Sequence, residues 1–183
     1  MSSFPSFEFS HVGLFVFDLD KMAGFYKELL GLLETDRGIV HGNVPVVFLS
    51  RSSRDHHQVV LAQGRTADMD AKLINQISLR LQSLADLRRV YQAAERRADT
   101  SKLRAVTHGN AFSVYFNDPE GNQLEFFVDG PWYVEQPIIE PLDLTLSDDE
   151  ILAQTYESFK DQPGFKDAEV WRKELQARID AAG

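Results

Sequence analysis

The sequence contains an internal repeat, and this repeat limits the folds that the chain can adopt. The segments FSHVGLFVFDL and INQISLRLQSL place polar and apolar residues at the same positions, so that His11 corresponds to Gln76, an offset of 65 residues (76 minus 11). The same offset places Tyr26 on Tyr91. The first segment is β-prone, and in the second polar and apolar residues alternate, so each is expected to be a β-strand. The repeat therefore indicates a duplicated structural unit.

A predicted helix and further strands follow each copy of the repeat. Apolar residues recur with helical spacing over residues 19–31 and 84–97. Short β-prone segments follow near residues 44–50, 57–63, 111–117 and 122–128, and the turn sequence DPEG separates the last two. We predict an α+β fold of two βαβββ modules, at about residues 7–65 and 72–130. These modules are expected to pair into a half-open, barrel-like cup.

Residues 136–183 differ from the two modules and form a predicted C-terminal tail. In the sequence SDDE, Ser147 and Glu150 have the spacing of a helical capping box, so a helix is expected to begin there. A second helix is expected at about residues 167–181. Because two helices cannot form a core alone, we expect the tail to pack on the domain of residues 1–135 or on the second chain of a homodimer.

Composition and charge exclude several classes of function. The chain carries 28 Asp and Glu against 19 Lys and Arg, a net charge of −9, which argues against nucleic acid or an anionic membrane as a partner. It has no cysteine, so disulfides, thiolate catalysis and cysteine-ligated zinc are excluded. The sequence shows neither a signal peptide nor an apolar run of membrane-spanning length. It thus predicts a cytoplasmic protein that binds any metal through His, carboxylate or amide side chains.

Three polar side chains are candidates for a metal site. His11 begins the first strand of the first module, Gln76 begins the first strand of the second, and Glu125 lies in the last strand within the apolar sequence LEFFV. A carboxylate is costly to bury without a partner, and a metal ion is one such partner. Each residue also has a structural alternative: a hydrogen-bonded strand histidine, a glutamine on the strand surface, and a carboxylate on a sheet edge.

The motifs of this chain resemble those of the vicinal oxygen chelate superfamily, which includes glyoxalase I, methylmalonyl-CoA epimerase and the extradiol ring-cleaving dioxygenases. The markers are HVGLFVFDLDKMAGFYKELLGL, VVFLS followed by HHQVVL, INQISLRLQSLADLRRVY and YFNDPEGNQLEFFVD, and they agree in order and spacing over residues 7–135. Within the superfamily, THGNAFSVYFNDPEGNQLEFF and DHHQVVL are most similar to the dioxygenases that act on catechols and biphenyl-diols.

The resemblance implies a set of metal ligands. His11 and Glu125 match two ligands of a divalent metal ion, which is Fe(II) in the extradiol enzymes. Gln76 occupies the position of their second histidine ligand, and this is a departure from the dioxygenase pattern. Isomerases of the superfamily use glutamine as a ligand, so Mn, Ni, Co and Zn are the alternative metals.

The resemblance also implies three catalytic residues. His57 matches a pocket histidine that handles substrate protons, Tyr115 matches a tyrosine that hydrogen-bonds the bound diol, and His108 resembles the proton donor to the ring-cleavage intermediate. Because neighbouring residues of a strand point to opposite faces, only one of His56 and His57 is expected to face the cup.

Three functions follow from these residues. The resemblance implies an extradiol dioxygenase that acts on a catechol-like aromatic diol with Fe(II) and O₂. Gln76 leaves open a divalent-metal isomerase or lyase of the glyoxalase or epimerase type. The third alternative is a metal-free protein that binds a small molecule, because proteins of this fold also sequester aromatic drugs.

Overall fold

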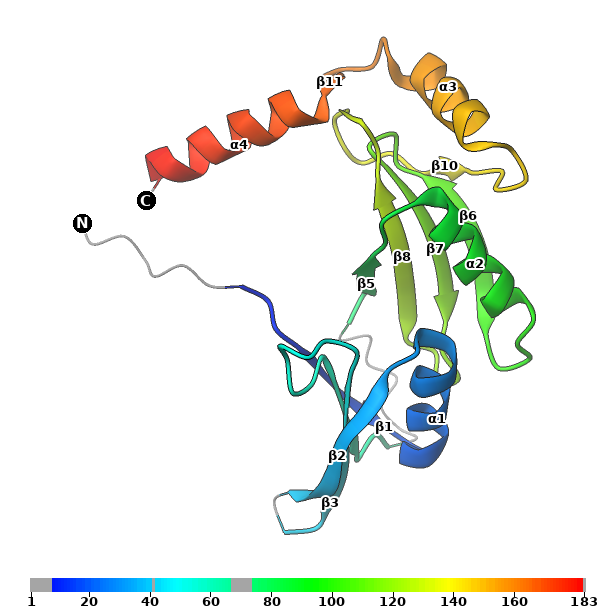
Figure 1. Ribbon diagram of the computed structural model, residues 1–183, viewed down its shortest axis with the longest axis vertical. Helices are drawn as coiled ribbons and strands as arrows, with labels where there is room; N and C mark the ends of the chain where they lie inside the picture. Colours follow the sequence, from blue (N-terminus) through cyan, green and yellow to red (C-terminus); the bar gives the residue numbers. More distant parts are fainter. Residues whose placement is uncertain (1–7, 41, 67–73, 183) are drawn as a thin grey trace. The chain divides into compact units, whose positions relative to one another are not determined.

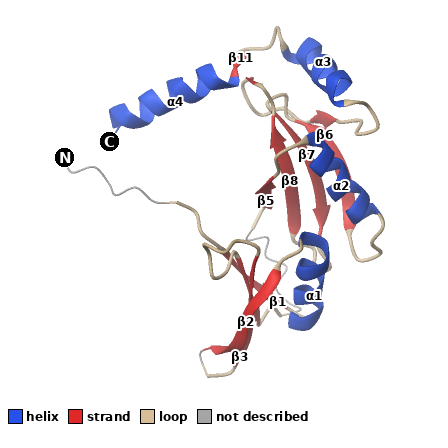
Figure 2. Ribbon diagram, in the orientation of Figure 1, coloured by secondary structure: helices blue, strands red, loops and turns tan. Residues whose placement is uncertain are grey.

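The computed structural model describes residues 8–40, 42–66 and 74–182, and the chain divides into two compact units (Figures 1 and 2). One unit holds the first module, Ser6–Asn75, and the turn Asp118–Asn122. The other unit includes Gln76–Asn117 and Gln123–Gly183, which are the rest of the second module and the tail. The α+β class, with two repeated modules and a helical tail, is confirmed.

The first module has the predicted βαβββ order. Its elements are β1 (Val12–Val16), α1 (Leu19–Leu30), β2 (Leu33–Val40), β3 (Val44–Ser50) and β4 (Val59–Gln63). The strands form one sheet in the order β1-β4-β3-β2, in which β1 and β4 are parallel and the other pairs are antiparallel. The sequence did not place β2, because most of its side chains are exposed and its residues LETDRGIV do not alternate.

Local signals in the sequence fix both ends of α1. The Asp18 side chain accepts a hydrogen bond from the Lys21 N–H, and Gly31 ends the helix with a left-handed φ of 64°. Between these ends the apolar stripe is buried, and Tyr26 is 1% exposed. The Tyr26 hydroxyl donates to the Asp118 carboxylate at 3.2 Å, and burial raises the pKa of both groups.

The turn Asp118–Asn122 stabilises the chain just before α1. The predicted β-turn is present, since the Gly121 N–H donates to the Asp118 carbonyl at 3.0 Å. The Glu120 carboxylate accepts hydrogen bonds from the Phe17 and Asp18 N–H groups at 2.8–2.9 Å. These bonds give a negatively charged partner to backbone groups at the start of the helix, where such a charge is favourable.

We predict that the Glu120→Ala variant loses about 1–3 kcal/mol of unfolding free energy, because two backbone N–H groups lose a charged acceptor. The Glu120 side chain is only 6% exposed. The control is Glu157→Ala, whose side chain is 65% exposed in a surface ion pair and should cost less than about 0.5 kcal/mol. Urea denaturation measures both values, and equal losses would contradict this role of Glu120.

The second module repeats the topology of the first. Its elements are β5 (Ile77–Arg80), α2 (Leu84–Glu95), β6 (Ser101–Thr107), β7 (Ala111–Asn117) and β8 (Gln123–Asp129). The parallel pairing has the same register in both modules: Val12 faces Val59 across β1 and β4, and Ile77 faces Leu124 across β5 and β8, each 65 residues further on. The offset found in the sequence is therefore the offset of the structural repeat. Strand β6 was not placed from the sequence.

Strand β9 (Trp132–Tyr133) follows the second module, and the tail comes after it. The elements of the tail are β10 (Glu140–Pro141), α3 (Asp148–Phe159), β11 (Lys166–Asp167) and α4 (Ala168–Ala182). The predicted capping box of Ser147 and Glu150 is present at the start of α3. Strand β10 extends the sheet of the second module, giving the order β10-β6-β7-β8-β5, so the tail packs on that module. The homodimer stays a prediction. No helix within the described ranges is long and apolar enough to cross a membrane.

Candidate functional site

A row of polar side chains crosses the sheet of the second module. Arg104 on β6 faces Tyr115 on β7, Tyr115 faces Glu125 on β8, and Glu125 faces Ser78 on β5. Residues that pair directly across strands project from the same face of a sheet. The alternate residues, such as Leu124 and Phe126, are buried on the other face, where α2 packs. The row therefore lies on the face opposite to α2.

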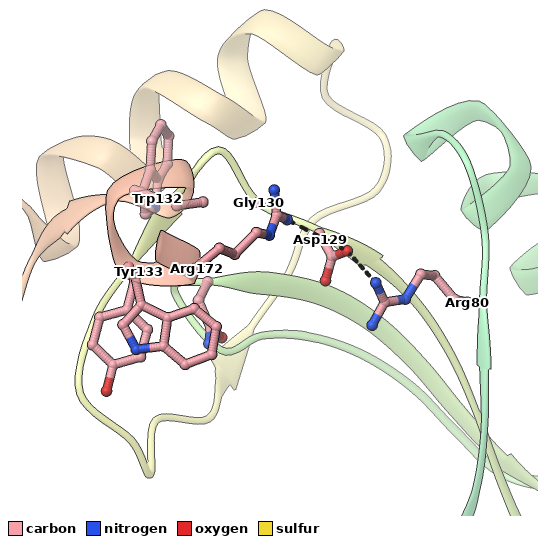
Figure 3. Close-up of a pocket in the computed structure, with 9 residues that line it drawn as sticks. Arg80, Asp129, Gly130, Trp132, Tyr133 and Arg172 are labelled. Atoms are coloured by element: carbon pink, nitrogen blue, oxygen red, sulfur yellow. Dashed lines mark hydrogen bonds and ion pairs between the residues drawn. The ribbon is translucent and has the colours of Figure 1, made fainter. Parts of the chain in front are cut away.

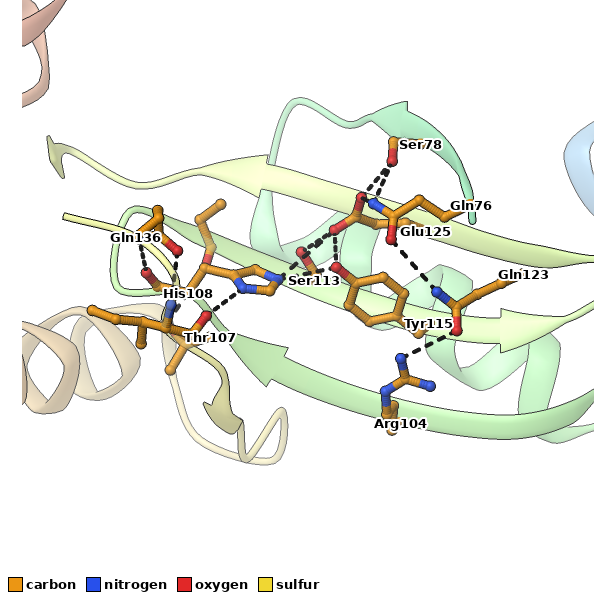
Figure 4. Close-up of polar contacts among 12 residues, drawn as sticks. Gln76, Ser78, Arg104, Thr107, His108, Ser113, Tyr115, Gln123, Glu125 and Gln136 are labelled. Carbon is orange, nitrogen blue, oxygen red and sulfur yellow. Dashed lines mark hydrogen bonds and ion pairs between the residues drawn. The ribbon is translucent and has the colours of Figure 1, made fainter. Parts of the chain in front are cut away.

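Glu125 is the centre of this row and is almost fully buried, with 7% of its surface exposed. Its Oε1 atom accepts hydrogen bonds from Ser113 Oγ at 2.9 Å and from the Tyr115 hydroxyl (Figure 4). Its Oε2 atom accepts from Ser78 Oγ at 2.5 Å and from Gln76 Nε2 at 2.6 Å. Four donors thus replace the water that the carboxylate loses on burial.

Tyr115 links Glu125 to His108. His108 Nε2 lies 3.1 Å from the Tyr115 hydroxyl (Figure 4). His108 Nδ1 lies 2.7 Å from the Ile138 carbonyl. A carbonyl only accepts, so Nδ1 carries a proton in this contact. The contact between His108 Nε2 and the Tyr115 hydroxyl connects the imidazole to Glu125 through the phenol.

Burial, followed by the hydrogen bond to Glu125, raises the pKa of Tyr115 to about 12 from 10.0. A raised pKa means that folding favours the protonated phenol, so its stabilisation is complete below about pH 10 and is lost as pH rises toward 12. We predict that Tyr115→Phe lowers the unfolding free energy by about 1–3 kcal/mol at pH 7, and that this deficit shrinks above pH 10.

The measurement is denaturant unfolding of both proteins across this pH range. The control is Tyr133→Phe, since the Tyr133 ring stacks on Trp171 and its hydroxyl has no hydrogen bond to any residue that the structure describes. A Tyr115→Phe deficit that is constant to pH 12 would contradict the assigned hydrogen bond.

The side chains that complete this network were not predicted from the sequence. Gln123 Nε2 donates weakly to Gln76 Oε1 at 3.5 Å, and Arg104 Nη2 donates to Gln123 Oε1 at 3.3 Å. A signal for several of them was available: Ser78, Ser113 and Gln123 each lie two residues from a predicted site residue, and that spacing places them on the same strand face.

The first module holds the other predicted residues, His11 and His57. Their rings lie 4.4 Å apart, and His56 Nδ1 lies 3.0 Å from His57 Nδ1. His56 Nε2 also lies 2.8 Å from the Asp36 carboxylate. Burial, followed by the charges of His11 and His56, lowers the pKa of His57. His56 and His57 both precede β4, so strand alternation does not set their directions, and it stays a prediction that only one of them faces the cup.

In the first module, the position that corresponds to Glu125 is apolar. Val60 pairs with Gly13 and Phe48 in the way that Glu125 pairs with Ser78 and Tyr115. Sequence duplication has therefore preserved the register but not the chemistry. A carboxylate on this face of the first module is Asp36 on β2, which pairs with Phe48 and contacts His56, so the position equivalent to Glu125 carries no charge.

A separate hollow of about 120 Å³ lies beside the tail, between β8 and α4 (Figure 3). Arg80 and Arg172 both approach the Asp129 carboxylate there, at 2.9 and 3.8 Å, and Tyr133 stacks on Trp171. The hollow is smaller than a usual small-molecule site, and its arginines already have a carboxylate partner. We therefore place the candidate site at Glu125.

Comparison with known proteins places this pair of modules in a family. Residues 8–126 match the Glyoxalase/Bleomycin resistance protein/Dioxygenase superfamily, so the match includes residues of both modules. The chain belongs to this superfamily. The resemblance drawn from the sequence motifs is confirmed at this level.

Individual proteins resemble the chain at low sequence identity. The uncharacterized protein YwbC of Bacillus subtilis (strain 168) is 25% identical over 120 residues, which are 64% of this chain and 94% of YwbC. A glyoxylase/bleomycin resistance protein/dioxygenase domain from Frankia sp. EAN1pec has a TM-score of 0.57 at 19% identity, over 70% of this chain and all of that one. The fosfomycin resistance protein FosX of Listeria monocytogenes, complexed with Mn(II) and sulfate, has a TM-score of 0.52 at 17% identity. This match covers 71% of this chain and 95% of the FosX chain. These structural matches support the fold.

The donor set of this superfamily member fits a divalent metal ion. Among the described residues, no three His, Cys, Asp or Glu side chains are grouped as metal ligands, so a centre at Glu125 needs the Gln76 amide as well. The NH₂ group of the Gln76 amide contacts Glu125 in this structure. Rotation of the amide would exchange the positions of the NH₂ group and the carbonyl oxygen, and the oxygen could then bind a cation. Amide oxygen, carboxylate and imidazole suit Mn, Fe, Co, Ni and Zn.

The structure thus sorts the predicted residues into two groups. Gln76, Glu125, Tyr115 and His108 lie together in the second module, and His11 and His57 lie together in the first. His41, which the sequence suggested to be a loop residue, lies outside the described residues.

Proposed function

We propose that the chain is a divalent-metal enzyme, that Glu125, Gln76 and His11 hold the ion, and that it cleaves the ring of a catechol-like diol with O₂. One observation carries the proposal: the connected hydrogen bonds of Glu125, Tyr115 and His108. They join a buried carboxylate, a protonated phenol and an imidazole in one line. This combination suits a substrate that is bound as an anion and later protonated.

When bound, Fe(II) supplies Lewis acidity to the diol oxygens and redox chemistry for O₂. Side chains of the protein carry out the proton transfers and hydrogen-bond the substrate. With its lowered pKa, His57 is a neutral base at pH 7 and takes a proton from a diol hydroxyl. Tyr115 keeps its proton, which it gives to Glu125 in this structure, and rotation of its hydroxyl would direct that proton to a diol oxygen, while His108 returns a proton after cleavage.

Gln76 favours a second candidate, a divalent-metal isomerase or lyase. An amide contributes no charge and binds Fe(II) less firmly than imidazole does, so a centre with Gln76 suits chemistry that does not change the oxidation state of the metal. In this alternative Glu125 and His57 serve the same roles as ligand and base. The preferred metal would be Mn, Co, Ni or Zn.

The two candidates are separated by their need for oxygen. Protein loaded with Fe(II) under argon is mixed with catechol or 2,3-dihydroxybiphenyl, and O₂ is then admitted. We expect a yellow ring-cleaved product from the dioxygenase. Turnover of an oxoacid or a hemithioacetal under argon, with no yellow product from any of several diols, would instead support the isomerase or lyase.

Substitution of Gln76 tests the ligand set directly. We predict that Gln76→His retains Fe(II) about tenfold more strongly or better, because imidazole is the stronger ligand, and that Gln76→Leu loses metal by at least a similar factor. The matched control is Gln123→Leu, which removes the neighbouring amide and should change metal retention less. Metal content after dialysis against a weak chelator measures the effect.

Equal metal retention in all four proteins would contradict the assignment of Gln76. Wild-type protein that retains no divalent metal under any loading condition would favour the third alternative, a metal-free binding protein of the same fold.

A further inference from the structure

Arg104 is a positive charge in the polar row that the proposed mechanism does not use. It lies on β6, next to Tyr115 on β7 and two strands from Glu125 on β8. Its guanidinium carbon lies 4.5 Å from the centre of the Tyr115 ring, and Arg104 is half-buried (Figure 4). The cation therefore stands beside the phenol that is expected to contact the substrate.

The hydrogen-bonding capacity of Arg104 is largely unused. A guanidinium has five N–H donors, and the bond found here is a long one of 3.3 Å to Gln123 Oε1. No carboxylate of the described residues lies within 4.0 Å of it, whereas Arg80 and Arg88 have carboxylate partners at 2.9 and 2.5 Å. In a chain with a net charge of −9, a half-buried arginine without a carboxylate partner has the capacity to bind an external anion.

We propose that Arg104 binds a carboxylate group on the substrate, so that the substrate is an acidic compound. This inference rests on the proposed function, because it places the reacting end of the substrate at Glu125 and Tyr115. Strands lie about 4.8 Å apart, so the backbones of β6 and β8 are separated by roughly 10 Å. An aromatic ring that carries the reacting oxygens at one end and an acid at the other spans this distance.

The geometry of arginine suits this role. Its planar fork binds both oxygens of a carboxylate, and it stacks on an aromatic ring at the same time. The Tyr115 ring holds the guanidinium in place, and Gln123 orients it through one contact. The other explanation for Arg104 is that it only supports the Tyr115 ring, and the experiment separates the two.

Binding to matched acids and amides tests the proposal. The full-length, metal-loaded protein is titrated by calorimetry under argon with 3,4-dihydroxybenzoate and 3,4-dihydroxybenzamide, and then with benzoate and benzamide. We expect the acid to bind about tenfold tighter or more than the amide in both pairs, because a charged hydrogen bond forms only with the acid.

The variants assign the preference to one residue. Arg104→Gln should remove the preference for the acid and leave amide binding unchanged, and Arg104→Lys should keep part of it. Arg80→Gln, the same change on a neighbouring strand of the sheet, should keep all of it. Thermal unfolding of each variant shows that the fold is intact.

The outcomes separate this proposal from the proposed function. A preference for benzoate without any gain from the two hydroxyl groups supports the role of Arg104 and contradicts the diol as substrate. Absence of an acid preference in both pairs, including undetectable binding of all four compounds, overturns the role of Arg104. So does an equal loss of acid and amide binding in Arg104→Gln, which would show that the residue only supports Tyr115.

Discussion

The candidate site depends on one interaction, the burial of the Glu125 carboxylate among four hydrogen-bond donors. A buried charge is tolerated only when its lost hydration is replaced, and here the replacement comes from β5, β7 and the residue just before β5. The donors reach Glu125 because three strands are held in one register. A shift of one residue in any of these pairings would turn donors away from the carboxylate. The fold of the second module and its chemistry are therefore specified together.

The two modules share a fold, but only the second has the buried carboxylate at the position of Glu125. Both modules have the same strand order and the same parallel register, and both cover one face of the sheet with a helix. In the first module, Val60 occupies the position that corresponds to Glu125, and Val60 pairs with Gly13 and Phe48 on the neighbouring strands. That module has histidines instead, just before β1 and before β4. The proposed metal ligands would therefore come from both modules, an imidazole from one and a carboxylate from the other.

The sequence predicted those parts of the molecule that depend on local patterns. Helix α1 could be bounded because Gly31 ends an apolar stripe, and α3 because Ser147 and Glu150 form a capping box. Strands β2 and β6 were missed, since β2 is polar and exposed, and β6 contains an irregularity at Lys102, which has a positive φ of 55°. For the site, the motifs pointed to Gln76, Glu125, Tyr115 and His108, which the structure brings together, but not to Ser78 and Ser113. They did not identify Arg104, because its position beside Tyr115 arises only from the pairing of β6 with β7.

We propose that Glu125, Gln76 and His11 hold one divalent metal ion. The most direct test is anomalous X-ray scattering from crystals of the metal-loaded protein, recorded on both sides of the absorption edge of the metal. The account predicts one strong peak within bonding distance of a Glu125 carboxylate oxygen, the Gln76 amide oxygen and a His11 ring nitrogen. A fully loaded crystal with no peak at Glu125, or with a peak that Gln76 and His11 do not contact, would contradict it.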